Sequence, residues 1–342
     1  MKVASILTTL LFVHLTMANA EDKSYLPSTI YQLDASFAHH TLVVEKSTHS
    51  LFLYQNDQEF PRLVKKYKVL TGKFIGNKTL QGDKKTPEGV YFFQKFHPSQ
   101  YLTKKYGDYG KIYGAGAFTT NYPNEIDKRS KKTGGGIWLH STDDDNRVSL
   151  GLDSKGCVVA IDKDLKDISQ YIDLLNTPVV IVQDLHYQTK ESWLKSKNEI
   201  TSVVNKWSEA WRNKDFETYI SSYSKTNFFD SIRGNHSQFK QYKKSVFARK
   251  DTPTIEMQDM SILNNGEYVV VTMLQDYTSP VVKDIGKKTL YLQKNASYEW
   301  KIVAEKWTKV LEKQNIAFTP NKLKYFSSQI QNKELVNDSE SI

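Results

Sequence analysis

Short apolar runs separated by turn-forming residues dominate the chain between residues 38 and 184. The runs are rich in valine, isoleucine, leucine and aromatic residues, which favour β-strands, and Gly, Pro, Asn and Asp stand between them. The predicted strands are Thr41–Glu45, Leu51–Tyr54, Leu63–Thr71, Val90–Phe93, Ile137–Leu139, Val158–Ile161 and Pro178–Val182. Only Asp164–Leu175 has clear helical spacing. The pattern predicts a mainly β domain with one helix over residues 38–184.

A different pattern begins near residues 188–197. Apolar residues at every third or fourth position predict an amphipathic helix over Ile200–Trp211, and two shorter helices follow it. The shorter helices are Phe216–Tyr223 and Phe239–Phe247, and the later strands are Ile255–Leu263, Tyr268–Tyr277, Lys288–Gln293 and Trp300–Thr308. Helices followed by antiparallel strands predict an α+β cone domain over residues 195–312. Trp207 and Trp211 share the apolar stripe, so we expect them in its core.

The two ends of the chain differ from both patterns. Lys2, an apolar stretch over Val3–Leu15 and the small residues Ala18–Ala20 are typical of a secretory signal peptide over residues 1–20. An uncleaved anchor is the alternative, but the stretch is short for a membrane span. We therefore expect an exported protein of the periplasm or cell envelope. Residues 313–342 form a polar tail.

The composition indicates which classes of binding partner and cofactor to expect. The 342 residues carry a formal net charge of +9, which favours anionic partners such as wall polymers. Export makes nucleic acid an unlikely partner, and lysines spread along the chain serve solubility equally well. The sequence has no His, Asp and Glu cluster with metal-ligand spacing, so we expect no metal or cofactor. His39 and His40, adjacent on a strand, would face opposite ways and serve a structural role.

The lone cysteine, Cys157, is the candidate nucleophile. It follows Gly156, and His140 ends the apolar run that precedes it. A histidine within reach would take the thiol proton and return it to a leaving amine, while amide N–H groups around Cys157 would stabilise an oxyanion. Gly156 would allow substrate to approach the backbone. The imidazole could be oriented by Asp143–Asp145 or by a backbone carbonyl. A buried structural cysteine and a redox sensor with an external partner are the alternatives.

These residues resemble a known signature. The YkuD-type L,D-transpeptidase domain has a histidine, a spacer, a small residue, any residue, a glycine and a cysteine. The matching positions are His140, Ser141 and Ser154–Cys157, and similar upstream blocks are Thr71–Lys73, Gly82-Asp83 and Thr86–Gly89. The resemblance implies a β-sandwich or barrel fold. The sequence departs from the family pattern at Val159, where many members of the family have Arg or Asn.

The resemblance also implies roles. Cys157 would be the acyl-accepting nucleophile, His140 its base, and the Ser141 carbonyl the group that orients the imidazole. The resemblance extends to Tyr113–Asn124, and we expect Ser154, Lys155, Tyr113 and Tyr122 to contact substrate. The implied reaction is attack on the meso-diaminopimelate–D-alanine bond of peptidoglycan stem peptides. A second stem-peptide amine then completes L,D-transpeptidation, or water completes L,D-carboxypeptidation.

The second half of the chain resembles an NTF2-like domain. A YkuD-type domain followed by an NTF2-like domain is similar to the cell-shape-determining L,D-carboxypeptidases of curved and helical bacteria. NTF2-like cones often hold a pocket, which would suit an anionic wall polymer or a glycan. A wall-binding protein with a decayed catalytic domain is the alternative from a different functional class.

Overall fold

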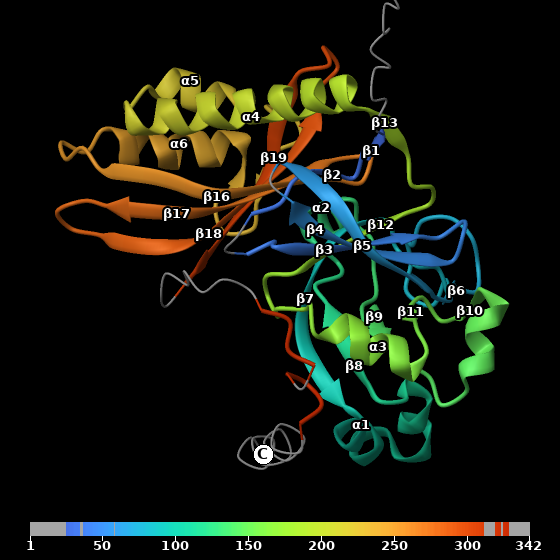
Figure 1. Cartoon of the computed structure of the whole chain (residues 1–342). Helices are drawn as coiled ribbons and strands as arrows, with labels where there is room; N and C mark the ends of the chain where they lie inside the picture. The colour runs from blue at the N-terminus through green and yellow to red at the C-terminus, as the bar shows by residue number, and fades with distance from the viewer. Residues whose placement is uncertain (1–24, 35–36, 58, 311–318, 323, 328–342) are drawn as a thin grey trace, which may run out of the picture.

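The computed structural model describes residues 25–34, 37–57, 59–310, 319–322 and 324–327. The predicted signal peptide, residues 1–20, lies outside the described residues. Figure 1 shows a mixed sheet with helices α1 and α3 on one side of the molecule, and a second sheet covered by helices α4–α6 on the other, while α2 lies where the two sheets meet. The YkuD-type and NTF2-like halves predicted from the sequence are both present.

The first half of the chain forms a mixed sheet of eight strands in the order β11-β9-β8-β7-β12-β3-β4-β5. In chain order these are β3 (His40–Glu45), β4 (Ser50–Asp57), β5 (Phe60–Lys68), β7 (Gly89–Pro98), β8 (Gly116–Thr120), β9 (Trp138–His140), β11 (Val158–Val159) and β12 (Pro178–Val182). Strand β12 is parallel to β3, and β11 is parallel to β9. Every strand predicted over this half is present within a few residues.

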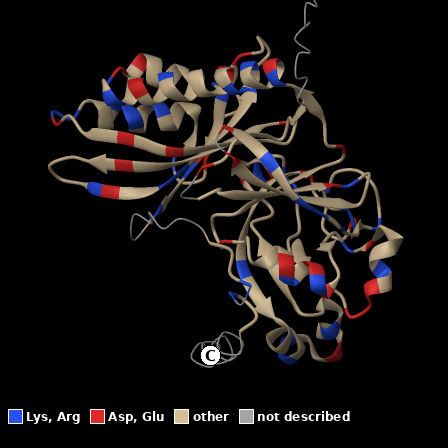
Figure 2. Cartoon of the chain, in the orientation of Figure 1, with Lys and Arg blue, Asp and Glu red and all other residues tan. Residues whose placement is uncertain are grey.

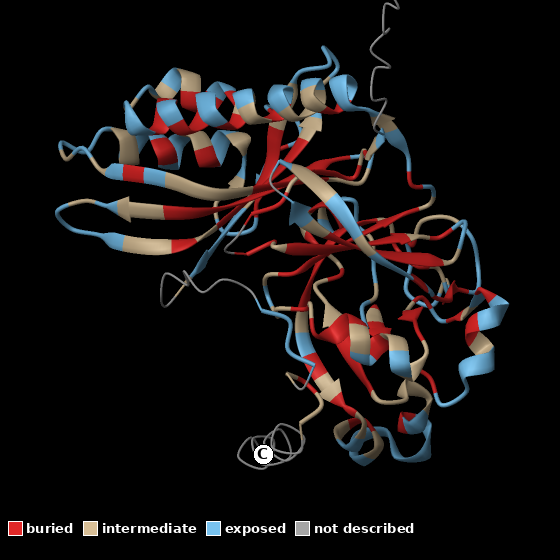
Figure 3. Ribbon diagram, viewed as in Figure 1, coloured by how far each residue is buried: buried red, intermediate tan, exposed pale blue. Residues whose placement is uncertain are grey.

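The continuous apolar runs of this sheet arise because both of its faces are buried. In β3, Leu42 and Val44 pack into a core beneath helix α3, whereas Val43 between them packs toward the second sheet. Side chains alternate across a strand, so a strand between two cores needs apolar residues at every position. Figure 3 shows buried residues concentrated where the two sheets meet.

The prediction of a single helix in this half is wrong. Helices α1 (Ser99–Tyr106), α2 (Glu125–Arg129) and α3 (Asp162–Ser169) are present, with 3-10 helices η1 (Gly107–Tyr113) and η2 (Asp145–Leu150). Helix α1 buries only Leu102, and α2 has five residues, so neither has an apolar stripe long enough to recognise. Two short strands, β6 (Thr71–Gly72) and β10 (Leu152–Ser154), pair in parallel.

The second half forms a sheet in the order β19-β18-β17-β16-β2, with three helices on one face. Its elements are α4 (Lys190–Arg212), α5 (Phe216–Ser221), α6 (His236–Phe247), β16 (Thr254–Asn264), β17 (Val269–Thr278), β18 (Lys283–Lys294) and β19 (Trp300–Lys309), with the short hairpin β14 (Phe229–Asp230) and β15 (Gly234–Asn235). Trp207 and Trp211 lie in the core between helices and sheet, as predicted. Helix α4 begins at Lys190, well before the predicted start.

The N-terminal strands join the two halves. Strand β1 (Tyr25–Pro27) pairs with β13 (Tyr187–Thr189), and β2 (Ile30–Gln32) adds to the edge of the second sheet beside β16. The interface is a buried apolar core that contains residues of both sheets. At its centre the Tyr268 hydroxyl accepts hydrogen bonds from Val90 N (2.9 Å) and Asn124 Nδ2 (2.7 Å). The second sheet therefore packs firmly on the first.

The described part of the tail returns to the first half. Tyr325 is buried against Phe96 and Phe118, and its hydroxyl donates to the Ile172 carbonyl at 3.0 Å. Lys324 pairs with Asp173 at 3.0 Å. Figure 2 shows basic and acidic residues interspersed on helices α3 and α4, whereas the charged residues of α6 are all lysines. Among the described helices, none has the length and apolar character needed to cross a membrane.

Candidate functional site

The sheet brings Cys157 and His140 to the same face. Strand β11 pairs in parallel with β9, with Val158 opposite Leu139 and Val159 opposite His140. Residues two apart along a strand share a face, so Cys157, immediately before β11, lies on the face that carries His140. The Cys157 thiol lies 3.4 Å from the Gly136 carbonyl oxygen, at the entrance to β9. Non-local strand pairing thus assembles two groups that the sequence only suggested.

His140 is buried and held in one orientation. Its Nδ1 atom lies 2.5 Å from the carbonyl oxygen of Ser141. A carbonyl only accepts hydrogen bonds, so Nδ1 carries the proton and Nε2 remains the basic nitrogen. Burial lowers the pKa of His140 to about 4, against the hydrogen bond to Ser141 that raises it and with the Arg147 charge that lowers it further. The imidazole is neutral at neutral pH.

Cys157 is a partly buried, free thiol. Burial raises its pKa to about 11, against a backbone hydrogen bond from Trp138 and the charge of Lys78, which both lower it. The resting site therefore pairs a neutral thiol with a neutral imidazole. This arrangement suits general-base activation during attack rather than a preformed thiolate.

Tyr113 forms a wall of the site. Its ring lies 4.9 Å from the His140 ring in an edge-to-face arrangement and 5.1 Å from the Trp138 ring, measured between centroids. Burial, with the electrostatic influence of the nearby Cys157 sulfur second, raises the pKa of Tyr113 to about 12. The Ser141 hydroxyl accepts from Ala115 N at 2.8 Å and donates to the Tyr113 carbonyl at 3.2 Å. Ser141 thus fixes both the imidazole and the segment that carries Tyr113.

Two residues of the turn before Cys157 contact the surrounding protein closely. Gly156 was expected to let substrate approach, but at φ +124° its absent Cβ would lie 2.8 Å from the Lys85 carbonyl oxygen, so protein fills that space. Ser154 was expected to bind substrate, but it is buried. Its hydroxyl accepts from Gly156 N at 3.0 Å and donates to the Cys157 carbonyl at 2.6 Å. Both residues shape the turn that presents the thiol.

Thr86 connects that turn to the upstream glycine-rich block. Its fully buried hydroxyl accepts from Gly72 N at 2.8 Å and donates to the Gly156 carbonyl at 3.0 Å. The Thr86 carbonyl accepts from the buried Lys46 ammonium at 3.1 Å, and Lys46 also pairs with Glu88 at 2.8 Å. Neither Thr86 nor Lys46 was expected to have a role at the site. The Thr86–Gly89 block was the available signal for Thr86, and no motif pointed to Lys46.

The two other residues expected to contact substrate differ in exposure, since Lys155 is exposed and Tyr122 is buried. Lys155 lies at the surface, with its ammonium 5.4 Å from the centre of the Tyr109 ring and 3.3 Å from the Tyr109 hydroxyl. Tyr122, which was also expected to contact substrate, is buried. Its ring is 5 % exposed, packs edge to face on Tyr91, and its hydroxyl donates to the Thr133 carbonyl at 3.3 Å. Its place is in the core beneath the sheet.

An ion pair borders the site beside His140. Arg147 of η2 donates from Nε to Asp153 Oδ2 at 2.9 Å and from Nη1 to the Thr142 hydroxyl at 3.4 Å, and its Nη2 atom lies 2.9 Å from the same Asp153 oxygen. Asp143–Asp145 are exposed and do not orient the imidazole, since Ser141 holds it. Val159 is fully buried with Leu70 and Val148. Arg147, to which no sequence motif pointed, thus brings a positive charge to the side of the site that carries His140.

The two adjacent histidines also differ from expectation. His39 and His40 do not face opposite ways, because His39 precedes strand β3 and their Nδ1 atoms lie 2.7 Å apart. Burial lowers the pKa of His39 to about 3 and that of His40 to about 4. Within the described ranges, no group of three His, Cys, Asp or Glu residues could hold a metal ion.

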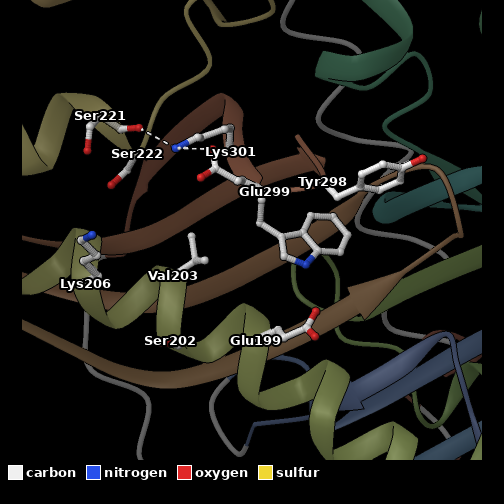
Figure 4. A pocket seen from close by; sticks show the side chains of 10 residues that line it. Glu199, Ser202, Val203, Lys206, Ser221, Ser222, Tyr298, Glu299 and Lys301 are labelled. Atoms are coloured by element: carbon white, nitrogen blue, oxygen red, sulfur yellow. Dashed lines mark hydrogen bonds and ion pairs between the residues drawn. The ribbon is translucent and has the colours of Figure 1, made fainter. Parts of the chain in front are cut away.

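Two of the larger open hollows lie in the second half of the chain, away from Cys157. One, of about 400 Å³, lies between α4, the end of α5 and the start of β19, and Figure 4 shows Glu199, Lys206, Tyr298 and Lys301 around it. The other, of about 380 Å³, lies in the cone beneath α6. Its charged lining residues are Arg233, Lys243, Arg249, Asp284, Lys288 and Glu305. The second hollow is thus predominantly basic.

The basic hollow is organised around a buried acid. Glu305 pairs with Lys288 at 2.8 Å and accepts from the Tyr223 hydroxyl at 2.8 Å. Burial raises the pKa of Glu305, but Lys288 and Lys243 outweigh it and bring the pKa to about 2. Burial lowers the pKa of Lys243 to about 8, and its ammonium lies 4.8 Å from the centre of the Trp211 ring.

Family models match both halves. The L,D-transpeptidase catalytic domain, YkuD, matches residues 39–181, and the Cds6 C-terminal NTF2-like domain matches residues 199–306. No curated protein matches the chain.

Two solved structures resemble the whole arrangement. Bd1075 of Bdellovibrio bacteriovorus is 32% identical, with a TM-score of 0.72 over 84% of this chain and 100% of that one. The helical cell shape determining protein Pgp2 of Campylobacter jejuni is 27% identical, with a TM-score of 0.63 over 80% of this chain and 96% of that one. Both likenesses extend across the two halves.

Proposed function

Because the chain belongs to the family that joins a YkuD-type L,D-transpeptidase catalytic domain to a C-terminal NTF2-like domain, we propose that it cleaves peptidoglycan stem peptides through Cys157. The bond broken is that between meso-diaminopimelate and the terminal D-alanine. The observation that carries the proposal is the placement of Cys157 on the face of His140, whose Nδ1 is held by the Ser141 carbonyl.

The first half-reaction begins from the neutral Cys157 thiol and the neutral His140 imidazole. Nε2 of His140 takes the thiol proton as Sγ of Cys157 attacks the carbonyl carbon at the L-centre of diaminopimelate. The carbonyl oxygen becomes an oxyanion, for which backbone N–H groups near the turn are the available donors. When the tetrahedral intermediate collapses, the C–N bond breaks and the imidazolium returns its proton to the departing amine. D-Alanine leaves, and a thioester joins Cys157 to the tripeptide stem.

The second half-reaction restores the enzyme. The amine of a second diaminopimelate attacks the thioester in L,D-transpeptidation, gives up a proton to His140 and forms a new amide crosslink. Water attacking the same carbonyl gives L,D-carboxypeptidation and a tripeptide stem. In both cases Cys157 leaves as thiolate and is protonated from His140. Similarity to the cell-shape protein Pgp2 supports the carboxypeptidase as the second candidate.

The substrate sets the place of action. An enzyme that acts on peptidoglycan works in the cell envelope, and the amino-terminal sequence of Lys2 followed by Val3–Leu15 supports export to the periplasm. The basic hollow of the second half would hold an anionic group of the wall. Its lining has four cations against two acids, and Trp211, Tyr242 and Trp307 supply aromatic surface.

Product analysis tests the proposal. The purified mature protein and a Cys157→Ala variant are each incubated with disaccharide-tetrapeptide muropeptides, and products are resolved by mass. We expect D-alanine release by the natural protein alone, with a crosslinked dimer indicating transpeptidation and a tripeptide alone indicating carboxypeptidation. Natural protein that leaves the muropeptide intact would support the decayed wall-binding alternative and contradict the proposal.

A further inference from the structure

In the Arg147–Asp153 ion pair, the guanidinium has more N–H donors than its protein partners use. Arg147 is 29 % exposed at its side chain and Asp153 34 %, so the pair lies at the surface of the site rather than in the core. A guanidinium has five N–H donors. Two of the Arg147 donors, on Nε and Nη1, hydrogen-bond Asp153 and Thr142, and Nη2 lies against Asp153, which leaves at least two N–H groups to meet a ligand from solvent.

The leaving group of the proposed reaction carries its charge close to the reacting nitrogen. In D-alanine the carboxylate carbon is two bonds from the amine, a distance of about 2.5 Å. His140 must reach that amine to return its proton, so the carboxylate must also lie near the imidazole. A cation on the His140 side of the site would therefore meet the carboxylate of a terminal residue, and of no residue inside a longer peptide.

Arg147 is placed for this contact. It reaches the Thr142 hydroxyl, two residues after His140, and its charge lowers the pKa of the imidazole. Lys155 is turned toward Tyr109, and Lys78 is buried in an ion pair with Asp83 at 2.7 Å. Val159, which follows Cys157 on the same face, has no polar atom to offer.

We infer that Arg147 is a specificity-determining residue that binds the free α-carboxylate of the terminal D-alanine. The inference rests on the proposed function and deepens it, because it explains why the enzyme would cut only the last peptide bond of the stem. Asp153 holds the guanidinium in place and shares it with the substrate. Arginine suits this task because its planar fork matches a carboxylate.

A cycle of two enzymes and two substrates tests the inference. The natural protein and Arg147→Met are each given a muropeptide whose D-alanine ends in a carboxylate and the same muropeptide ending in a carboxamide. For the natural protein we expect kcat/KM to fall about 10- to 100-fold on the carboxamide, the size of a lost charge-assisted hydrogen bond. For Arg147→Met we expect the two substrates to differ by less than about twofold, while Arg147→Lys retains part of the preference.

The controls separate three results. Arg62→Met removes a similar ion pair, Arg62 with Asp57 at 2.8 Å on an exposed strand, and should keep the full preference for the carboxylate. Equal losses on both substrates in Arg147→Met would assign Arg147 a bracing role and overturn the inference, as would a natural protein indifferent to the carboxamide. A natural protein that cleaves neither substrate would instead overturn the proposed function.

Discussion

The carbonyl oxygen of Ser141 lies 2.5 Å from Nδ1 of His140, while the Ser141 hydroxyl holds the neighbouring segment through Ala115 N. One residue thus sets the tautomer of the imidazole and the position of the Tyr113 wall. This arrangement needs no carboxylate to orient the base, which is consistent with the exposed positions of Asp143–Asp145. The neutral state of the pair follows from burial of both groups.

The neutral Cys157–His140 pair predicts that kcat/KM changes little over a broad pH range. His140 must be unprotonated to act as a base, and its lowered pKa of about 4 means that activity is lost only as the pH falls through that value. Cys157, at about 11, stays protonated across the neutral range. We expect kcat/KM for the tetrapeptide to be nearly constant between about pH 5.5 and 9. A narrow bell with limbs near pH 6 and 8 would indicate a thiolate–imidazolium pair instead.

The Thr86 hydroxyl predicts a distant effect on the thiol. Thr86→Val keeps the shape but leaves Gly72 N and the Gly156 carbonyl without their partner, so the turn before Cys157 should shift. We expect a stability loss of about 1–3 kcal/mol and a lower kcat. Thr86→Ser retains the hydroxyl and should keep both properties. The check is thermal unfolding together with D-alanine release, and equal behaviour of the two variants would contradict the bracing role.

The histidine pair predicts acid sensitivity. His39 and His40 have pKa values lowered to about 3 and 4 in the folded state, against about 6.5 in the unfolded chain. The unfolded state therefore binds protons first, so the stabilisation is complete above about pH 6.5 and is lost as the pH falls toward 4. We expect a His39→Gln/His40→Gln variant to lose less of its unfolding temperature between pH 7 and 5. An unchanged slope would show that the pair does not contribute.

The Tyr268 hydroxyl predicts coupling between the two sheets. Tyr268→Phe removes the acceptor of Val90 N and Asn124 Nδ2 in the shared core. We expect destabilisation of about 1–3 kcal/mol, measured by calorimetry, because buried donors are left unsatisfied. Tyr298→Phe, at a side chain 82 % exposed, is the matched control and should have no effect. Separate unfolding of the two halves in the natural protein would contradict a shared core.

The strands were predictable because both sheet faces are buried, which makes runs such as Leu42–Val44 apolar throughout. Strand β2 was not, because its three residues pair with β16 far along the chain. Within the site, the sequence pattern selected Cys157 and His140 and missed Thr86 and Arg147. A hydroxyl or guanidinium gains its role only from the non-local atoms around it. The burial of Tyr122 could not be read from the sequence either, because it depends on packing against Tyr91.

Direct observation of the covalent intermediate tests the central claim. The purified protein is mixed with disaccharide-tetrapeptide, quenched in acid within the first turnover, and analysed by intact mass and peptide mapping. The mechanism predicts an adduct equal to the muropeptide minus D-alanine on Cys157, absent from Cys157→Ala and weakened in His140→Gln. D-alanine released with no adduct on Cys157, or release that persists in Cys157→Ala, would contradict nucleophilic catalysis by this thiol.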